Sequence, residues 1–441
     1  MNKKLIIFPA QQPQSSSVVC EYSIKMTLFP YSLFRTMKNF VPAILAMILT
    51  ISFEAKGAVL PKEKPLQYII VTIHQHEMNS AVFEDINKKM GRGNNGTVQI
   101  GISTIYSYFQ VPKGGQSIAK RIENDLALIT EADMPFLIQL DGEQWWQHRP
   151  DLWNWWNPDV SGYDPKNAEN VEWTGWGPEY AIKIAWRNWG RQLRVLPPPN
   201  LMSPAYRNAW QMEMEEIIPV IVKWAQSLPE EKKDLFIGVK IGWESSIGVN
   251  SWYYPNGNEL LDMPTADDPQ TGLDTEILPS RGVQTIGYAA VHTAGIRREG
   301  ELTEADLAEI AQRHLASLAQ KASELGIPRD RLFTHGAAWK DNELLYEAPL
   351  NCWSSPGWSF YRYASDPSKD QGVRRALSLS DAPYWAATEW LLQNHDGIHW
   401  KKALENVLAD NRCRYVCIFN WNSIKDSDAV HDAIRSIVTP P

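Results

Sequence analysis

The chain lacks the features that mark several common classes of protein. Its 441 residues include only four cysteines, which match neither a disulfide framework nor a zinc-binding pattern. The net charge is −8, so no basic surface points to nucleic acid. We find no nucleotide-binding glycine motif, no internal repeat and no low-complexity stretch. We therefore expect an ordinary globular protein that needs no cofactor and binds no nucleic acid.

Long hydrophobic runs are also scarce, and the one that stands out lies near the N-terminus. Lys38 precedes an apolar run over residues 40–53, and small residues follow it. This order is typical of a secretory signal peptide, and the run is short for a membrane span. Met37 is an alternative start residue. We predict an N-terminal extension and signal peptide over 1–57, a catalytic barrel over 58–441, a secreted or periplasmic location, and no integral membrane span in the mature chain.

Tryptophan, in contrast, is abundant. The chain has 20 tryptophans, about three times the number that average composition gives for this length. Flat aromatic faces stabilise a core, and they also stack on sugar rings. Nine tryptophans fall between residues 141 and 205, which favours a carbohydrate-binding surface there, alongside a small core beneath a long loop. They are Trp145, Trp146, Trp153, Trp155, Trp156, Trp173, Trp176, Trp186 and Trp189.

The remaining chain predicts strands that alternate with helices. Helical spacing of apolar residues occurs over 117–131, 206–228 and 303–325. Most of the strand candidates are continuous apolar runs, as expected for parallel strands that are buried on both faces. Eight such strands with intervening helices predict an α/β fold, a (β/α)₈ TIM barrel. The strand candidates are 67–74, 97–104, 135–140, 235–242, 331–335, 358–363, 384–388 and 414–420.

Two connections are too long for a minimal barrel. Residues 141–205 follow the third predicted strand, and residues 245–301 follow the fourth. Long insertions of this kind usually build the site at the carboxyl ends of the strands. Polar and aromatic residues at those ends are therefore the candidates for the site. They are His74, His76, Tyr106, Asp141, Glu143, Glu244, His335, Glu389, Asn420 and Trp421, with Tyr108, Tyr361 and Arg362 as further possibilities.

Two of these candidates are carboxylates at the ends of apolar strands. Glu244 follows the fourth strand beside Trp243, and Glu389 ends the seventh beside Trp390. A carboxylate in such a place is costly unless it is paired or used. Cleavage of a glycosidic bond requires a pair of carboxyl groups, one to protonate the leaving oxygen and one to attack the anomeric carbon or activate water. The alternative is that each glutamate is a structural ion-pair partner.

This layout resembles the clan A glycoside hydrolases, which are retaining (β/α)₈ enzymes. The segment 242–248 (GWESSIG) is similar to the acid/base segment of the barrel-type β-galactosidases, and 203–210 (SPAYRNAW) is also similar to them. The resemblance implies that Glu244 is the acid/base and Glu389 the nucleophile. Trp421 matches an aromatic residue that commonly floors the sugar subsite. Trp243 stands where the clan usually has asparagine, which leaves an inverting mechanism as an alternative.

The predicted partner is a carbohydrate substrate, and no metal is assigned. We predict hydroxyl recognition by His74, His76, Tyr106, Asp141, Glu143, His335 and Asn420, and stacking by Trp145, Trp146, Trp390 and Trp421. Two other functions stay open. One is a metal-dependent barrel resembling the amidohydrolases, with His74, His76 and His335 as ligands and Lys240 nearby. The other is a barrel that binds carbohydrate without cleaving it.

Overall fold

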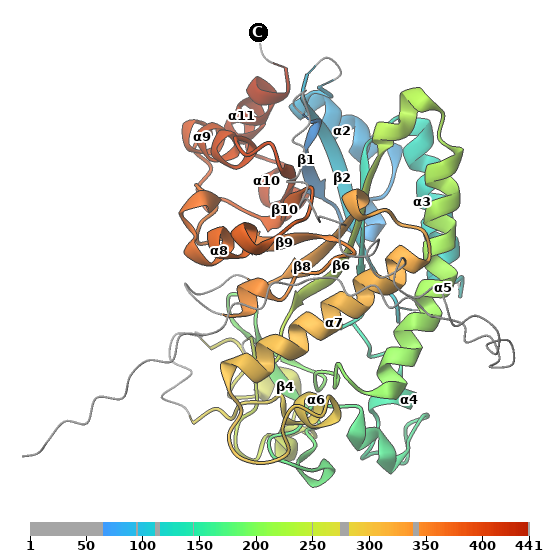
Figure 1. Ribbon diagram of the computed structural model, residues 1–441, viewed down its shortest axis with the longest axis vertical. Coiled ribbons are helices and arrows are strands. Elements are labelled where there is room, and N and C mark those ends of the chain that lie inside the picture. The colour runs from blue at the N-terminus through green and yellow to red at the C-terminus, as the bar shows by residue number, and fades with distance from the viewer. Residues whose placement is uncertain are drawn as a thin grey trace, which may run out of the picture. The chain divides into compact units, whose positions relative to one another are not determined.

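The computed structural model describes residues 65–439 except 94–95, 111–114, 144, 249, 274–281 and 338–343, so the predicted signal peptide lies outside the described residues. Eight parallel strands close into a barrel, in the order β1-β11-β10-β9-β8-β6-β3-β2 (Figure 1). The predicted (β/α)₈ barrel is therefore confirmed. The strands are β1 (Gln67–Thr72), β2 (Val98–Ser107), β3 (Phe136–Asp141), β6 (Phe236–Ser245), β8 (Leu332–Gly336), β9 (Ser355–Phe360), β10 (Trp385–Trp390) and β11 (Cys413–Ile418).

The sixth barrel strand, β9, begins three residues before its predicted start at 358. It opens with Ser355, Pro356 and Gly357, which give no hydrophobic strand signal. The structure explains the small residue here. A Cβ atom on Gly357 would lie 2.3 Å from the Thr388 side chain of the neighbouring strand, so the close approach of β9 to β10 requires glycine.

Helices cover the outside of the barrel, and each of the three predicted helices is present. The helix α3 begins one residue later than predicted, and α5 runs as one helix through Pro219. In α7 the Thr303 hydroxyl accepts from the Asp306 N–H, and the Asp306 carboxylate accepts from the Thr303 N–H, which together form a capping box. The covering helices are α2 (Ser80–Met90), α3 (Ile118–Ala132), α5 (Pro204–Ser227), α7 (Glu304–Glu324), α8 (Gln371–Leu379), α9 (Gly397–Leu408) and α11 (Asp428–Val438).

The inside of the barrel changes from apolar to polar along the strands. Tyr68, Leu137 and Phe333 belong to a buried apolar cluster inside the barrel. Further along the strands, Gln139 donates to the Ser103 hydroxyl at 2.7 Å, and Lys240 Nζ lies 3.0 Å from His335 Nδ1. Buried polar side chains are costly unless they are hydrogen-bonded, and these are. The polar layer brings charge and hydrogen-bonding groups close to the carboxyl ends of the strands.

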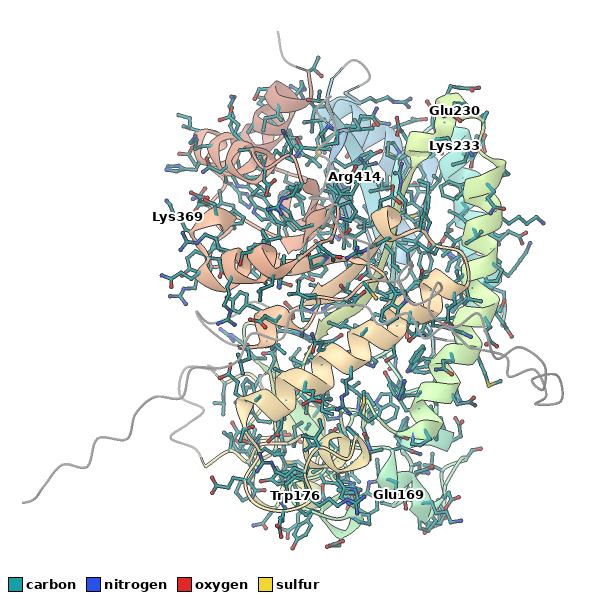
Figure 2. All side chains as sticks on the ribbon, viewed as in Figure 1. Glu169, Trp176, Glu230, Lys233, Lys369 and Arg414 are labelled. Carbon is teal, nitrogen blue, oxygen red and sulfur yellow. The ribbon has the colours of Figure 1, made fainter. Side chains whose placement is uncertain are left out.

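The two long connections fold together as one unit. Strands β4 (Ala185–Asn188) and β5 (Gln192–Val195) of the first pair with β7 (Ser251–Trp252) of the second in an antiparallel sheet. Trp186 is fully buried at its centre, and its indole N–H donates to Asp268 at 3.0 Å. Trp176, labelled in Figure 2, also crosses between the insertions by donating to the Gly300 carbonyl. The insertions therefore stabilise each other.

We predict that Thr303→Ala lowers the free energy of unfolding by about 1 kcal/mol, because it removes the N-cap of α7. Chemical denaturation measures the loss. Ser317→Ala is the matched control, since this half-buried serine lies in the middle of the same helix and bonds only to carbonyls one turn back. An equal loss in both variants would contradict the importance of the cap.

Candidate active site

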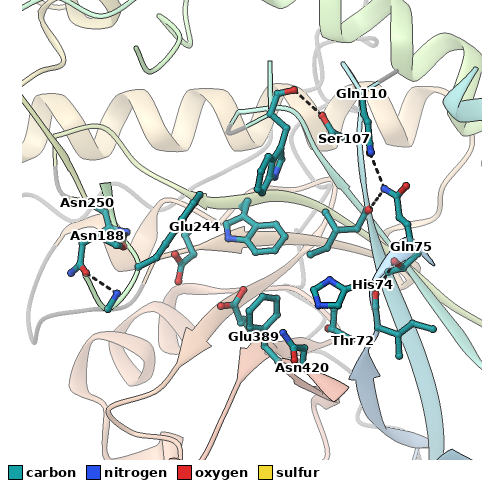
Figure 3. Close-up of a pocket in the computed structure, with 18 of the residues that line it drawn as sticks. Thr72, His74, Gln75, Ser107, Gln110, Asn188, Glu244, Asn250, Glu389 and Asn420 are labelled. Atoms are coloured by element: carbon teal, nitrogen blue, oxygen red, sulfur yellow. Dashed lines mark hydrogen bonds between the residues drawn. The ribbon is translucent and has the colours of Figure 1, made fainter. Parts of the chain in front are cut away.

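A cavity of about 960 Å³ opens at the carboxyl ends of the barrel strands. Its volume falls in the range of small-molecule sites. The barrel and the insertions both contribute to its walls (Figure 3). From the barrel come Thr72, Ile73, His74, Gln75, Thr104, Ile105, Ser107, Gln110, Trp243, Glu244, Tyr361, Glu389, Gln393, Phe419 and Asn420, and from the insertions come Trp145, Gln147, His148, Asn188, Trp189, Gly190 and Asn250.

Glu244 and Glu389 both line this cavity, and their carboxyl groups point toward one another in Figure 3. Each lies at an irregularity of its strand. The pairing of β6 with β8 shifts register between Ile241 and Ser245, and Glu244 has a left-handed backbone with φ of 46°. The pairing of β10 with β9 shifts between Ala387 and Glu389. A non-glycine residue in a left-handed conformation is uncommon, and such residues cluster at functional sites.

Glu389 is almost completely buried, and several groups act on its carboxyl group. The Tyr361 hydroxyl donates a hydrogen bond to it. Burial raises the pKa of Glu389 most strongly, the negative charge of Glu244 adds to this, and the resulting pKa is about 8. The Tyr361 hydrogen bond and the charges of Lys240 and Arg187 act in the opposite direction. The two glutamates together therefore keep one proton at neutral pH.

Three tryptophans form aromatic walls of the cavity. Trp145 and Trp189 stack on each other with ring centroids 6.1 Å apart, and each is 40% exposed. Trp243 precedes Glu244, and the Lys240 ammonium lies 4.4 Å from its ring centroid. Exposed flat rings in the wall of a cavity suit the apolar faces of sugars. Trp189 and Trp243 were not among the predicted stacking residues.

Side-chain amides are the commonest polar groups in the lining. An amide donates and accepts hydrogen bonds, as a sugar hydroxyl does, so such a wall suits a ligand with many hydroxyls. Most of these amides escaped the sequence analysis, because only the folded insertions and the loops after the strands bring them to the cavity. They are Gln75, Gln110, Gln147, Asn188, Asn250, Gln393 and Asn420.

The structure brings five of the predicted site residues together in the cavity: Glu244, Glu389, His74, Trp145 and Asn420. His76 is exposed next to them, with its ring stacked on that of His74 at 5.4 Å. Asn420 follows β11, and His74 follows β1, which puts both at the strand ends where they were predicted.

Three predicted hydroxyl-binding residues are buried away from the lining. Asp141 accepts the Glu143 N–H, and burial together with the Glu143 charge raises its pKa to about 7. Glu143 accepts from the Ser245 hydroxyl, and its carboxylate lies 3.1 Å from His314 Nε2. His335 is bonded to Lys240 and Ser359. These side chains make contacts within the protein that fix the walls around Glu244.

Four other predicted contacts do not line the cavity. Tyr106 precedes Ser107, and Trp390 follows Glu389, so strand alternation directs both toward the covering helices. Tyr106 bonds to Asp125 of α3, and Trp390 packs on Trp400 of α9. Trp146 is buried with its indole N–H on the Pro197 carbonyl, and Trp421 stacks on His431. We therefore leave Tyr106, Trp146, Trp390 and Trp421 out of the proposed substrate contacts.

The histidines of the amidohydrolase alternative do not converge. His74 and His76 stack on each other at the surface, whereas His335 is buried in the polar layer of the barrel. Within the part of the chain that the structure describes, no group of three or more His, Cys, Asp or Glu side chains is arranged to hold a metal ion. Over the same part, no helix has the length and apolar character needed to cross a membrane.

The raised pKa of Glu389 predicts how stability depends on pH. The folded protein holds this proton with a pKa of about 8, against an ordinary value of 4.5, so the free energy of unfolding falls as pH rises from about 5 to 8. We predict that Glu389→Gln removes this decline and leaves the variant more stable than the wild type at pH 8, by on the order of a few kcal/mol. Thermal unfolding across this pH range tests it, and a difference that does not grow with pH would contradict it.

Comparisons with known proteins give only distant similarities. No family model matches the chain, and no curated protein matches it. The similar solved structures include the YdhT protein of Bacillus subtilis (10% identity, 86% of each chain, TM-score 0.42). They also include the Bacillus subtilis mannanase man26 (12% identity, 86% of this chain and 85% of that one, TM-score 0.40) and the β-1,4-D-mannanase of Cryptopygus antarcticus (10% identity, 85% and 91%, TM-score 0.40). The fold assignment rests on the strand order of the barrel itself.

Proposed function

We propose that this protein is a glycoside hydrolase that cleaves an oligo- or polysaccharide outside the cytoplasm. The observation that carries the proposal is the convergence of Glu244 and Glu389 in one cavity. The stacked Trp145 and Trp189 and the amide-rich lining support a carbohydrate as the substrate. The predicted signal peptide supports the location.

In the proposed reaction, Glu244 donates its proton to the glycosidic oxygen while Glu389 attacks the anomeric carbon. The bond between that carbon and the leaving oxygen breaks, and a covalent glycosyl-enzyme forms. Glu244, now ionised, removes a proton from water, whose oxygen attacks the same carbon. The bond to Glu389 then breaks, which restores both carboxyl groups to their starting states.

Three groups near Glu389 favour the ionised form that a nucleophile needs. The Tyr361 hydroxyl, Lys240 and Arg187 each lower the pKa of its carboxyl group, against the larger raising effects of burial and the Glu244 charge, so the proposed role requires that Glu244 hold the shared proton when the substrate is bound. A nucleophile must be ionised when it attacks, and the Tyr361 hydrogen bond also holds the carboxylate in one orientation. The positions of the two glutamates, after the fourth and seventh barrel strands, agree with the roles that the resemblance to clan A implies.

We predict that Glu244→Gln and Glu389→Gln each lower the rate of cleavage at least 10³-fold, since removing a member of a catalytic pair leaves only the weaker contributions of binding. The measurement is release of sugar from a panel of aryl glycosides and plant or host polysaccharides. Glu301→Gln, at an exposed glutamate, is the control and should keep full activity. Full activity in either the Glu244→Gln or the Glu389→Gln variant would contradict the proposal.

Azide separates the two roles. We predict that azide restores activity to Glu389→Ala on an activated aryl glycoside and gives a glycosyl azide of inverted configuration, because azide takes the place of the nucleophile. With Glu244→Ala, the covalent intermediate still forms, so the azide product keeps the configuration of the substrate. The opposite pattern would exchange the two roles. Inversion in the wild-type product, followed by NMR, would replace the covalent route by direct attack of water.

The two alternatives predict other outcomes. A barrel that only binds carbohydrate would keep its sugar affinity in the wild type and both glutamine variants and would cleave nothing. A metal-dependent hydrolase would lose activity on treatment with a chelator and recover it with zinc. We expect wild-type activity to be unchanged by the chelator.

A further inference from the structure

Arg187 is a buried charge to which the proposed reaction assigns no chemical step. It belongs to β4 of the first insertion, and only 4% of its surface is exposed. Its Nε and Nη2 groups are buried, and neither has a hydrogen-bond partner among the residues described. Unsatisfied guanidinium groups are costly in a protein interior, and such groups persist mainly where they serve a function.

The negative charges of four carboxyl groups act on this guanidinium, although none of them forms a hydrogen bond with its Nε or Nη2 among the described residues. The strongest interaction is with Glu244 of β6, followed by Glu143 and Asp141 at the end of β3, and then Glu389 of β10. Glu143 is already engaged by Ser245 and His314, and Asp141 accepts the Glu143 N–H. The charge of Lys240, on β6, also acts on Glu389. Arg187 is thus a positive charge that reaches the catalytic pair from outside the barrel.

We propose that Arg187 is a positioning residue that lets Glu244 and Glu389 share one cavity. Its positive charge offsets the repulsion between the two carboxylates and favours their ionised forms. This inference rests on the proposed function. It makes the insertion sheet a part of the catalytic machinery, although no residue of that sheet would touch the reacting atoms.

The sheet holds Arg187 firmly. Asn188 donates its N–H to the Asn250 carbonyl at 3.2 Å, and the Asn250 amide donates to the Asn188 carbonyl at 3.0 Å. Asn188 and Asn250 both line the cavity. The same segment carries Trp189, whose ring centroid lies 5.6 Å from the Arg187 guanidinium. Trp189 therefore joins the cavity wall to the segment that holds Arg187.

The test compares Arg187→Met and Arg187→Lys with Arg194→Met. Arg194 lies on β5 of the same sheet, where it pairs with Asp268 and bonds to carbonyls of the second insertion, so its loss weakens the sheet without changing the charge beside the glutamates. Two measurements are made on each variant: thermal unfolding from pH 5 to 9, and the pH profile of kcat/KM on aryl glycosides with good and poor leaving groups.

In Arg187→Met we expect the carboxyl groups to ionise less readily, because an attractive positive charge is gone. Its loss of stability relative to the wild type should therefore grow as pH rises toward 8. Both limbs of the kcat/KM profile should move to higher pH by about one unit or more. At neutral pH, good leaving groups should be slowed at least as much as poor ones, because Glu389 must be ionised to attack, whereas a higher pKa keeps Glu244 protonated. Arg187→Lys should restore part of each effect.

Arg194→Met should lower stability by an amount that does not change between pH 5 and 9, and it should leave the pH profile in place. A Met variant at Arg187 that behaves in the same way would overturn the inference and make Arg187 a structural residue. A wild-type protein that cleaves no glycoside would overturn the proposed function instead. The stability measurement still tests the charge effect in that case, because it requires no substrate.

Discussion

The central constraint in this structure is the electrostatic repulsion between two carboxyl groups that are withdrawn from water into one cavity. Burial and the charge of Glu244 together raise the pKa of Glu389 to about 8, which makes the fully ionised pair unfavourable at neutral pH. The surroundings respond to this constraint. The Tyr361 hydroxyl bonds to one carboxylate, Lys240 lies beneath the cavity, and Arg187 approaches from the insertions. Each reduces the cost of bringing the pair together without removing the shared proton.

The barrel and the insertions make different contributions to this arrangement. The parallel strands bring residues that are far apart in the chain to one edge, so that Glu244 and Glu389 meet although 145 positions separate them. The insertions then add aromatic and amide walls and a cation. Because β4 and β7 come from different insertions, neither connection could form its part of the cavity alone. The site therefore depends on packing between two segments that follow different strands.

Several residues that were predicted from strand ends do not line the cavity, because their side chains point toward the covering helices or lie behind the cavity wall. A residue at a strand end was predicted to point into the site, but side chains alternate between the two faces of a strand. Ser107 and Glu389 line the cavity, whereas their neighbours Tyr106 and Trp390 pack against α3 and α9. Asp141 and Glu143 lie one layer behind the wall, where they act on Arg187 and Ser245. Sequence position located the strand ends to within about three residues, but the orientation of each side chain required the register of the barrel.

The sequence alone determined the barrel, the two long insertions and the pair of glutamates at strand ends, because buried parallel strands and amphipathic helices leave strong periodic patterns that depend on neighbours in the chain. It could not reveal Arg187, Asn188, Trp189 or Asn250 as parts of the site, since their positions follow from pairing between β4 and β7 across more than 60 residues. The left-handed backbone of Glu244 and the stacking of Trp145 on Trp189 likewise have no local signal. Tertiary packing decided these features, because contacts between distant parts of the chain orient side chains whose direction the local sequence pattern does not specify.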